Sequence, residues 1–154
     1  QMCIRDRNGR AKVLTETGKD WTKGMIKASE KMLEIAKSEN IEIAVLMDIS
    51  AACGSQVIYD GNRFGKNKAY QIGSGVSAAQ LKRNGFKVIS QRDFASLEIL
   101  YAKIDVQHKV DHKKVDHHEI EWYKSYFNKW YKKNRTANIR NRCTNPNSDK
   151  NKLI

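Results

Sequence analysis

The most constraining feature of the sequence is an apolar run that stops abruptly at a stretch of small residues. Ala44–Met47 is apolar at every position, which is typical of a strand buried on both faces in a parallel sheet covered by helices. Small side chains then occupy residues 50–55, with Cys53 among them. Ligands of such sheets collect beyond the carboxyl ends of the strands. The sequence therefore predicts an open rim where a ligand can approach the Cys53 sulfur.

The flanking segments alternate between helical and strand-like patterns. Apolar spacings of three and four predict a helix over residues 20–39 whose core face consists of Trp21, Met25, Ala28, Met32 and Ile35. The other expected elements are strand 41–47, strand 56–59, loop 62–73, helix 75–84, strand 86–89 and helix 90–103. Ser90 is the predicted N-cap of the last helix. This order predicts an α/β fold, a Rossmann-like three-layer domain with a mostly parallel sheet, over residues 8–104.

Residues 105–154 form a basic tail that differs in character from the rest of the chain. The tail holds twelve Lys and Arg, six Asp and Glu and all four His, and so half of the net charge of +12. A helix is predicted over residues 118–133, and the Asn-rich remainder is expected to be mobile. Excess basic charge suggests nucleic acid as a partner. A solvated, partly disordered extension explains the same composition and is the favoured interpretation.

Two patterns in the basic tail allow a functional and a structural interpretation. His108 and His112 are spaced to share one face of a helix and chelate a metal, but Lys113 and Lys114 would repel the cation. We therefore favour adventitious nickel or zinc binding over a physiological site. Aromatic and basic residues interleave over residues 122–133 and could stack on bases. An amphipathic helix that packs its aromatic side is the favoured explanation.

The first residues of the chain bear on the origin of that segment, and the cysteines bear on the cellular compartment of the protein. Residues 1–7, Gln-Met-Cys-Ile-Arg-Asp-Arg, resemble a translated sequencing-adaptor remnant and are excluded from fold reasoning, so Cys3 is not expected to be native. The three widely spaced cysteines do not form a disulfide framework, and no apolar run is long enough to span a membrane. We expect a cytoplasmic protein without a membrane segment, and the oligomeric state stays open.

Position alone leaves two interpretations of Cys53 open. The thiol is either a functional group at the rim, whose thiolate a helix beginning near Gly54 would favour, or a small buried side chain that fills space. Nearby, Gly73-Ser-Gly75 opens a predicted helix and could bind an anion through free amides, although this motif by itself is a weak signal.

Several motifs in a fixed order favour the functional interpretation of Cys53. They are Asp20-Trp-Thr22, Ala44-Val-Leu46, Ser50-Ala-Ala-Cys-Gly-Ser55, Ile58-Tyr-Asp-Gly61 and Gly73-Ser-Gly-Val76. Together they resemble the C-terminal two-thirds of the family labelled domain of unknown function 523, which includes thiouracil desulfidases. That family typically has Ser-Pro-Ser-Cys-Gly-Ser around its cysteine, so Ala51 and Ala52 are departures from the pattern.

The resemblance implies a [4Fe-4S] cluster held by three cysteines, with one iron open to a sulfur-containing substrate. It implies that Cys53 is the third cluster ligand and that Ser50 is catalytic, either moving a proton or orienting the attacking water. We also expect substrate contacts from residues of the same motifs, namely Ser55, Tyr59, Asp60 and Gly61.

The N-terminal motifs of the family are missing from this chain. The first two cluster cysteines belong to those motifs, and Ile4-Arg5 follows Cys3 where the second motif has Pro-Glu. We therefore interpret the chain as an N-terminally truncated desulfidase-like protein whose intact form removes sulfur from a thiolated small molecule such as a thiopyrimidine. Without two cluster ligands, its enzymatic status as given is open. The alternative is a non-enzymatic module whose basic tail binds RNA or a protein partner.

Overall fold

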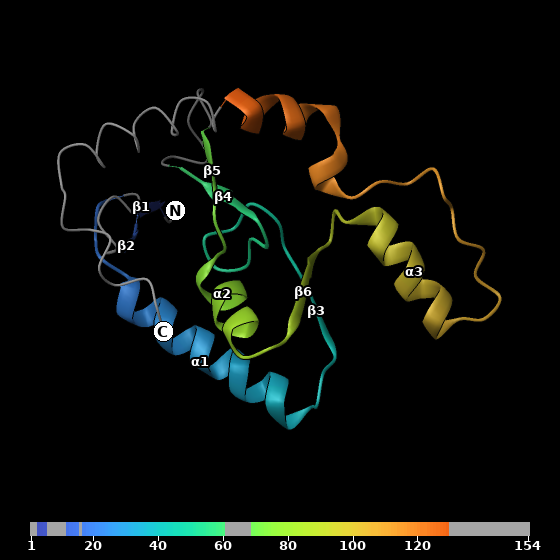
Figure 1. The fold of residues 1–154 in the computed structure, drawn as a ribbon. Helices are drawn as coiled ribbons and strands as arrows, with labels where there is room; N and C mark the ends of the chain where they lie inside the picture. Colours follow the sequence, from blue (N-terminus) through green and yellow to red (C-terminus); the bar gives the residue numbers. More distant parts are fainter. Residues whose placement is uncertain (1–2, 6–11, 16, 61–68, 130–154) are drawn as a thin grey trace, which may run out of the picture. The chain divides into compact units, whose positions relative to one another are not determined.

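The computed structural model describes residues 3–5, 12–15, 17–60 and 69–129 (Figure 1). It divides into two units, Gln1–His117 and His118–Ile154. The elements are β1 (Cys3–Arg5), β2 (Lys12–Leu14), α1 (Thr22–Ser38), β3 (Ile43–Leu46), β4 (Val57–Tyr59), β5 (Tyr70–Ile72), α2 (Val76–Arg83), β6 (Lys87–Ser90), α3 (Phe94–Ile104) and a 3-10 turn (His117–Glu119). No helix in the described ranges has both the length and the apolar character needed to cross a membrane.

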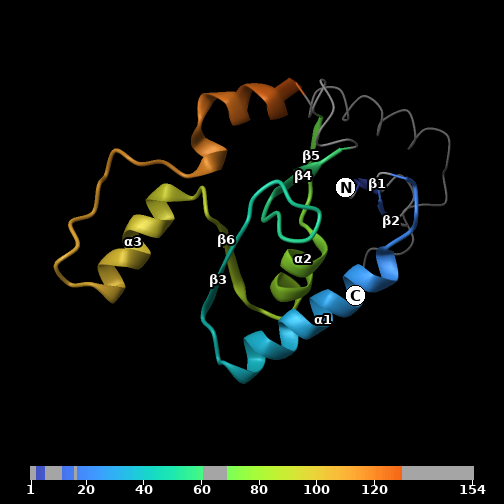
Figure 2. The same ribbon diagram turned by 180° about the vertical axis from the view of Figure 1, so that it is seen from behind.

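A parallel pair of strands, β3 and β6, forms the centre of the first unit. Ile43 pairs with Lys87 and Leu46 with Ser90, which confirms the predicted parallel pairing. Both views show α1 and α2 on one side of this pair and α3 on the other (Figures 1 and 2). On the α1–α2 side, a core cluster forms from Leu33, Ala36, Ala44 and Leu81. The crossover from β3 to β6 through helix α2 is the kind of connection that parallel pairing requires.

Helix α1 forms where the sequence predicts it, but it turns a different face to the core. Its buried residues are Ser29, Leu33 and Ala36. Trp21 and Ile35, both expected inside, are 48% and 52% exposed. Ser29 can be buried in this face because its hydroxyl donates a hydrogen bond to the carbonyl oxygen of Ile26, at 2.7 Å. The expected core face was therefore partly wrong.

The described strands also form two antiparallel pairs. β1 pairs with β2, and β4 pairs with β5. Strand β5 lies inside residues 62–73, where we expected a loop, and residues 62–68 of that expectation lie outside the described residues. A strand of three residues is too short to show the alternation by which strands are recognised in a sequence. Val57 and Ile58 of β4 are buried, and Ile58 packs with Val13 and Ala51.

Helix α3 begins later than expected, at Phe94. Ser90 is not its N-cap: the Ser90 hydroxyl accepts a hydrogen bond from the Arg92 N–H at 3.0 Å, while the Asp93 carboxylate accepts one from the Ser90 N–H at 2.7 Å. Ser90 and Asp93 thus close a turn before the helix begins. Of the residues in α3, Glu98 is the buried one, although most of the helix is apolar.

Residues 105–117, which we call the strap, return along α3 without forming a helix. The Glu98 carboxylate accepts hydrogen bonds from His108 Nε2 and the Asp111 N–H, both at 2.9 Å, and from Lys114 Nζ. Asp116 accepts two further bonds from Ser96, at 2.9 and 2.6 Å. Polar contacts therefore hold the strap against α3, and the predicted helical spacing of His108 and His112 does not occur.

The contacts of the strap should stabilise the fold less as the pH falls into the acid range. Hydrogen bonds from Lys114, the Asp111 N–H and His108 lower the pKa of Glu98 from 4.5 to about 2. The ionised carboxylate therefore stabilises the folded state above pH 4.5, and this contribution is lost as the pH falls from there through about 2. We expect Glu98→Gln to lower the urea midpoint at neutral pH and to flatten its pH dependence in this window. An unchanged midpoint and slope would contradict the assignment, and Glu121→Gln, in the second unit, is the control.

Candidate catalytic loop around Cys53

The chain leaves strand β3 through a strained residue. Ile49 has φ +55°, in the left-handed region that a β-branched side chain rarely adopts, and it is buried. A parallel bridge to Ile58 holds it beside the β4 strand. Strain of this kind persists only where the surroundings fix it, and it gathers at functional sites. The turn delivers residues 50–55 to the carboxyl end of β3, as the sequence predicted.

Ser50 organises the loop through its side chain and its backbone. Its Oγ accepts hydrogen bonds from the N–H groups of Ala52 and Cys53, both at 3.2 Å. Its carbonyl oxygen accepts a third bond from the Gly54 N–H at 2.8 Å. A hydroxyl oxygen has two acceptor sites, so the group that Ser50 still offers is its own O–H.

The N-terminus of α2 holds the same loop from the other side. The N–H groups of Val76 and Ser77 donate to the carbonyl oxygens of Ala51 and Ala52, at 2.9 and 2.8 Å. The Gly75 N–H donates to the Gly54 carbonyl at 2.8 Å. These amides are therefore engaged by the protein itself, and the anion site suggested by Gly73-Ser-Gly75 does not form there.

Cys53 is half-buried and carries a free thiol. Residues 51–53 form a turn, so the helix imagined near Gly54 is absent and the helix end near the loop is that of α2. Cys53 is also the one cysteine whose side chain the structure describes. A cluster held by three cysteines needs three thiolates, so the described donor set does not fit a [4Fe-4S] cluster.

The expected substrate residues separate into two groups. Ser55 lies in the loop with Ser50 and Cys53, is 1% exposed, and its Oγ has no hydrogen-bond partner among the described residues. Tyr59 and Asp60 lie at the other end of β4. There Tyr59 packs its ring against Tyr70, 5.2 Å between ring centroids, and the Asp60 N–H donates to the Ala69 carbonyl. Gly61 lies outside the described residues.

Asp48 is a candidate that sequence reasoning missed. It lies two residues after the end of β3 and two before Ser50, and its Oδ1 is buried without a hydrogen-bond partner among the described residues. Its N–H donates to Gln91 Oε1 at 2.6 Å. A buried carboxylate oxygen without a partner is costly and marks a place where a polar group can bind. An acidic residue immediately after an apolar strand was the signal that could have found it.

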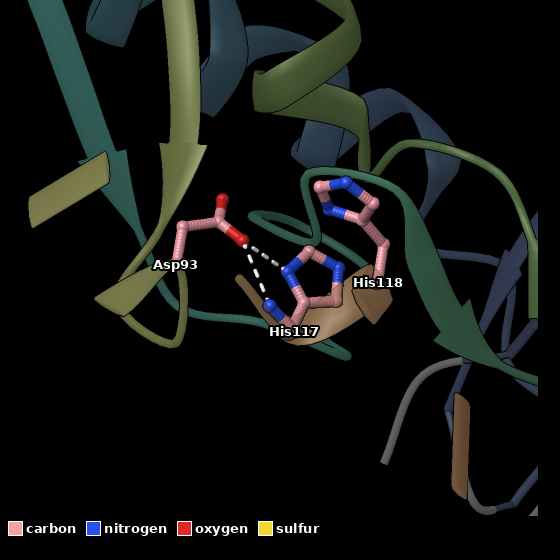
Figure 3. Close-up of side chains that lie close together, drawn as sticks. All are labelled: Asp93, His117 and His118. Carbon is pink, nitrogen blue, oxygen red and sulfur yellow. Dashed lines mark hydrogen bonds and ion pairs between the residues drawn. The ribbon is translucent and has the colours of Figure 1, made fainter. Parts of the chain in front are cut away.

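The histidine-rich segment has a structural explanation within the first unit. Figure 3 shows the His117 ring facing Asp93, whose Oδ1 accepts hydrogen bonds from His117 Nδ1 and from the His117 N–H. Both side chains are buried. His108 binds Glu98 instead. His108 and His117 therefore fasten the strap, which accounts for two of the four histidines without a metal.

In the second unit, residues 121–129 are helical, while 130–133 of the predicted helix and the Asn-rich end lie outside the described residues. Its aromatic rings contact one another, Trp122 with Tyr126 at 5.5 Å and Tyr123 with Phe127 at 4.6 Å between centroids. Phe127 is 2% exposed. Trp122 is 46% exposed, so the amphipathic helix that we favoured over a base-stacking surface stays a prediction.

Comparison with known proteins connects this loop to a family. The profile of the 2-thiouracil desulfurase family matches residues 1–93, which include the whole Cys53 loop. The chain belongs to this family. The match ends before α3, so α3, the strap and the second unit lie outside it.

Two relatives show how much of a family member the chain covers. It is 41% identical over 86 residues to the uncharacterized protein YbbK of Bacillus subtilis (strain 168), covering 56% of this chain and 55% of that protein. It is 29% identical to a solved structure, the [4Fe-4S]-dependent thiouracil desulfidase TudS, with a TM-score of 0.53 over 66% of this chain and 64% of that one. The chain thus spans between half and two-thirds of the relatives that it matches.

Proposed function

We propose that this 2-thiouracil desulfurase family chain is part of a desulfidase that removes sulfur from a thiolated small molecule of the thiouracil type. The observation that carries the proposal is the Ser50–Cys53 turn. Ser50 Oγ accepts two backbone N–H groups and so presents its O–H as a donor, three residues from a half-buried free thiol. TudS, whose fold this chain matches, is a [4Fe-4S]-dependent thiouracil desulfidase.

In this proposal Cys53 is one thiolate ligand of the [4Fe-4S] cluster, and the remaining ligands come from outside the described residues. Because one described thiol does not hold a cluster, we derive no reaction step through it. The chain's own contribution is the Ser50 hydroxyl, which donates a hydrogen bond to the substrate or to the attacking water and can move a proton there. Ser55, with its unpartnered buried hydroxyl, is the best placed of the four residues proposed to bind substrate.

We extend the proposal to the organisation of the protein. Residues 8–104 are the desulfidase-like segment, in a Rossmann-like three-layer domain. Helices on both sides of the β3–β6 pair support this architecture (Figure 1). The intact protein acts in the cytoplasm, where a reducing environment preserves cluster thiolates.

Anaerobic reconstitution with iron and sulfide, followed by a thiouracil assay, tests this function. We expect this chain to assemble no stable cluster, and the same chain extended upstream to assemble one and release sulfide from thiouracil. In the extended protein, Cys53→Ser should lose the cluster. Ser50→Ala should keep it while turnover falls by about 10²–10⁴-fold, the usual contribution of a proton-transferring group.

Ser38→Ala is the matched control, because Ser38 is exposed in α1 and bonds only locally, to the Ile35 carbonyl. An upstream reading frame without the two cysteine motifs would sink the proposal. So would an extended Cys53→Ser protein that retains both cluster and turnover.

A further inference from the structure

Lys82 connects two turns that meet at the Cys53 loop. It lies in the last turn of α2, and its Nζ donates hydrogen bonds to the Ser55 carbonyl oxygen and to Ser74 Oγ, the latter at 3.2 Å. Ser74 Oγ donates to the same Ser55 carbonyl at 3.0 Å. One carbonyl oxygen thus accepts two donors from different segments, which uses its full accepting capacity.

Both ends of this connection lie close to Cys53 in the chain or in space. Ser55 follows Cys53 by two residues, and Ser74 precedes Gly75, whose Cα faces the Ala52–Cys53 peptide so closely that a Cβ would lie 2.6 Å from the Cys53 nitrogen. Lys82 is exposed overall, and the partial burial of its ammonium between these turns lowers its pKa. Hydrogen bonds made by a charged donor are roughly twice as strong as neutral ones.

The next residue in the helix shows that this contact is specific. Arg83 is also basic and exposed and lies in the same last turn of α2. No hydrogen bond or ion pair joins its side chain to another described residue. The contact therefore follows from where position 82 points and not from the basic character of this helix end.

We propose that Lys82 is a positioning residue that fixes the orientation of the Cys53 thiol by joining residues 50–55 to the turn before α2. This inference rests on the proposed function in that Cys53 is a residue of the proposed site. Lys82 acts through Ser55 and Ser74. A functional thiol gains from being held in one orientation by supporting contacts of this kind.

The test compares Lys82→Gln, Lys82→Arg and Arg83→Gln in the full chain. Two quantities are measured: hydrogen exchange of the Gly54, Val76 and Ser77 amides, and the rate of Cys53 alkylation by iodoacetamide at neutral pH. The alkylation is read by mass spectrometry on the Cys53 peptide, so that Cys3 and Cys143 do not contribute. We expect Lys82→Gln to speed exchange about tenfold, the loss of one charge-assisted hydrogen bond, and to change the alkylation rate at least about threefold.

Lys82→Arg should restore most of both effects, because it keeps a cationic donor, and Arg83→Gln should match the unmodified chain. The proposal is overturned if Lys82→Gln behaves like Arg83→Gln, or if exchange changes while Cys53 reactivity does not, since the lysine is then only structural. A changed Cys53 reactivity together with unimpaired desulfidation by the extended Cys53→Ser protein would leave the positioning intact and remove the ligand role.

Discussion

Replacing Gly75 with alanine is expected to detach the Cys53 loop from α2 and to lower the free energy of unfolding by about 3–5 kcal/mol. The added Cβ would lie 2.4 Å from the Ala52 carbonyl carbon and 2.5 Å from its oxygen. These are backbone atoms that cannot rotate away, so the loop and the helix must separate. Separation breaks the hydrogen bonds of Val76 and Ser77 to the loop carbonyls. Urea unfolding measures the effect.

Gly73→Ala is the matched control for this substitution. It lies two residues away in the same turn, and its Cβ would meet only Ile58 side-chain atoms at 3.6 and 3.8 Å, ordinary van der Waals contacts. We expect its unfolding free energy to stay within about 1 kcal/mol of the unmodified chain. If both substitutions lowered the free energy of unfolding equally, the effect of Gly75→Ala would come from the lost conformational freedom of glycine and not from the close approach of Gly75 to the Ala52 backbone.

Leu81→Ala should have the second large effect, a loss of about 2–5 kcal/mol. Leu81 is 1% exposed and packs against Leu33, Ala36 and Ala44, so truncation leaves a cavity where α1, α2 and β3 meet. Since domains are stable by only about 5–15 kcal/mol, this loss is a large share of the total. Chemical denaturation followed by circular dichroism provides the measurement.

Ile35→Ala serves as its comparison and also tests the orientation of α1. Apolar spacing predicted Ile35 in the core, whereas the structure leaves it 52% exposed. A change within about 0.5 kcal/mol supports the observed face, because exposed substitutions away from special features cost little. A loss as large as that of Leu81→Ala would mean that the helix presents the face first predicted.

The elements of the fold could be predicted from sequence where one local pattern dominates. The apolar run Ala44–Met47 predicted a strand, and β3 forms there in parallel with β6. The expectation that this strand is buried on both faces was wrong, because Ala44 is buried while Val45 and Met47 are 43% and 64% exposed. The orientation of α1 could not be predicted, because Ile35 and Leu33 both belong to apolar stripes and tertiary packing decides between them. Strand β5 was missed since three residues carry no period.

The candidate site, too, could be predicted from the sequence only in part. Motif order drew attention to Cys53 and Ser50, the side chains to which the family resemblance assigns the chemistry. The contacts that hold them come from backbone amides of α2 and from Lys82, and neither leaves a residue-type signal at a fixed spacing. Asp48 was overlooked because its burial follows from tertiary packing around Gln91 and the end of β3, which no local pattern encodes.

The main-chain contacts of the loop separate positions whose side chain can vary without disturbing them from positions where it cannot. Carbonyl oxygens at 51 and 52 accept the α2 amides whatever side chains they carry, and no hydrogen bond of the described loop uses the N–H of residue 51. A proline there, which lacks that N–H, would present the same carbonyl. The backbone contacts of the loop therefore do not require Ala at positions 51 and 52. Position 75 is different, because a Cβ there would meet the backbone of Ala52 and Cys53.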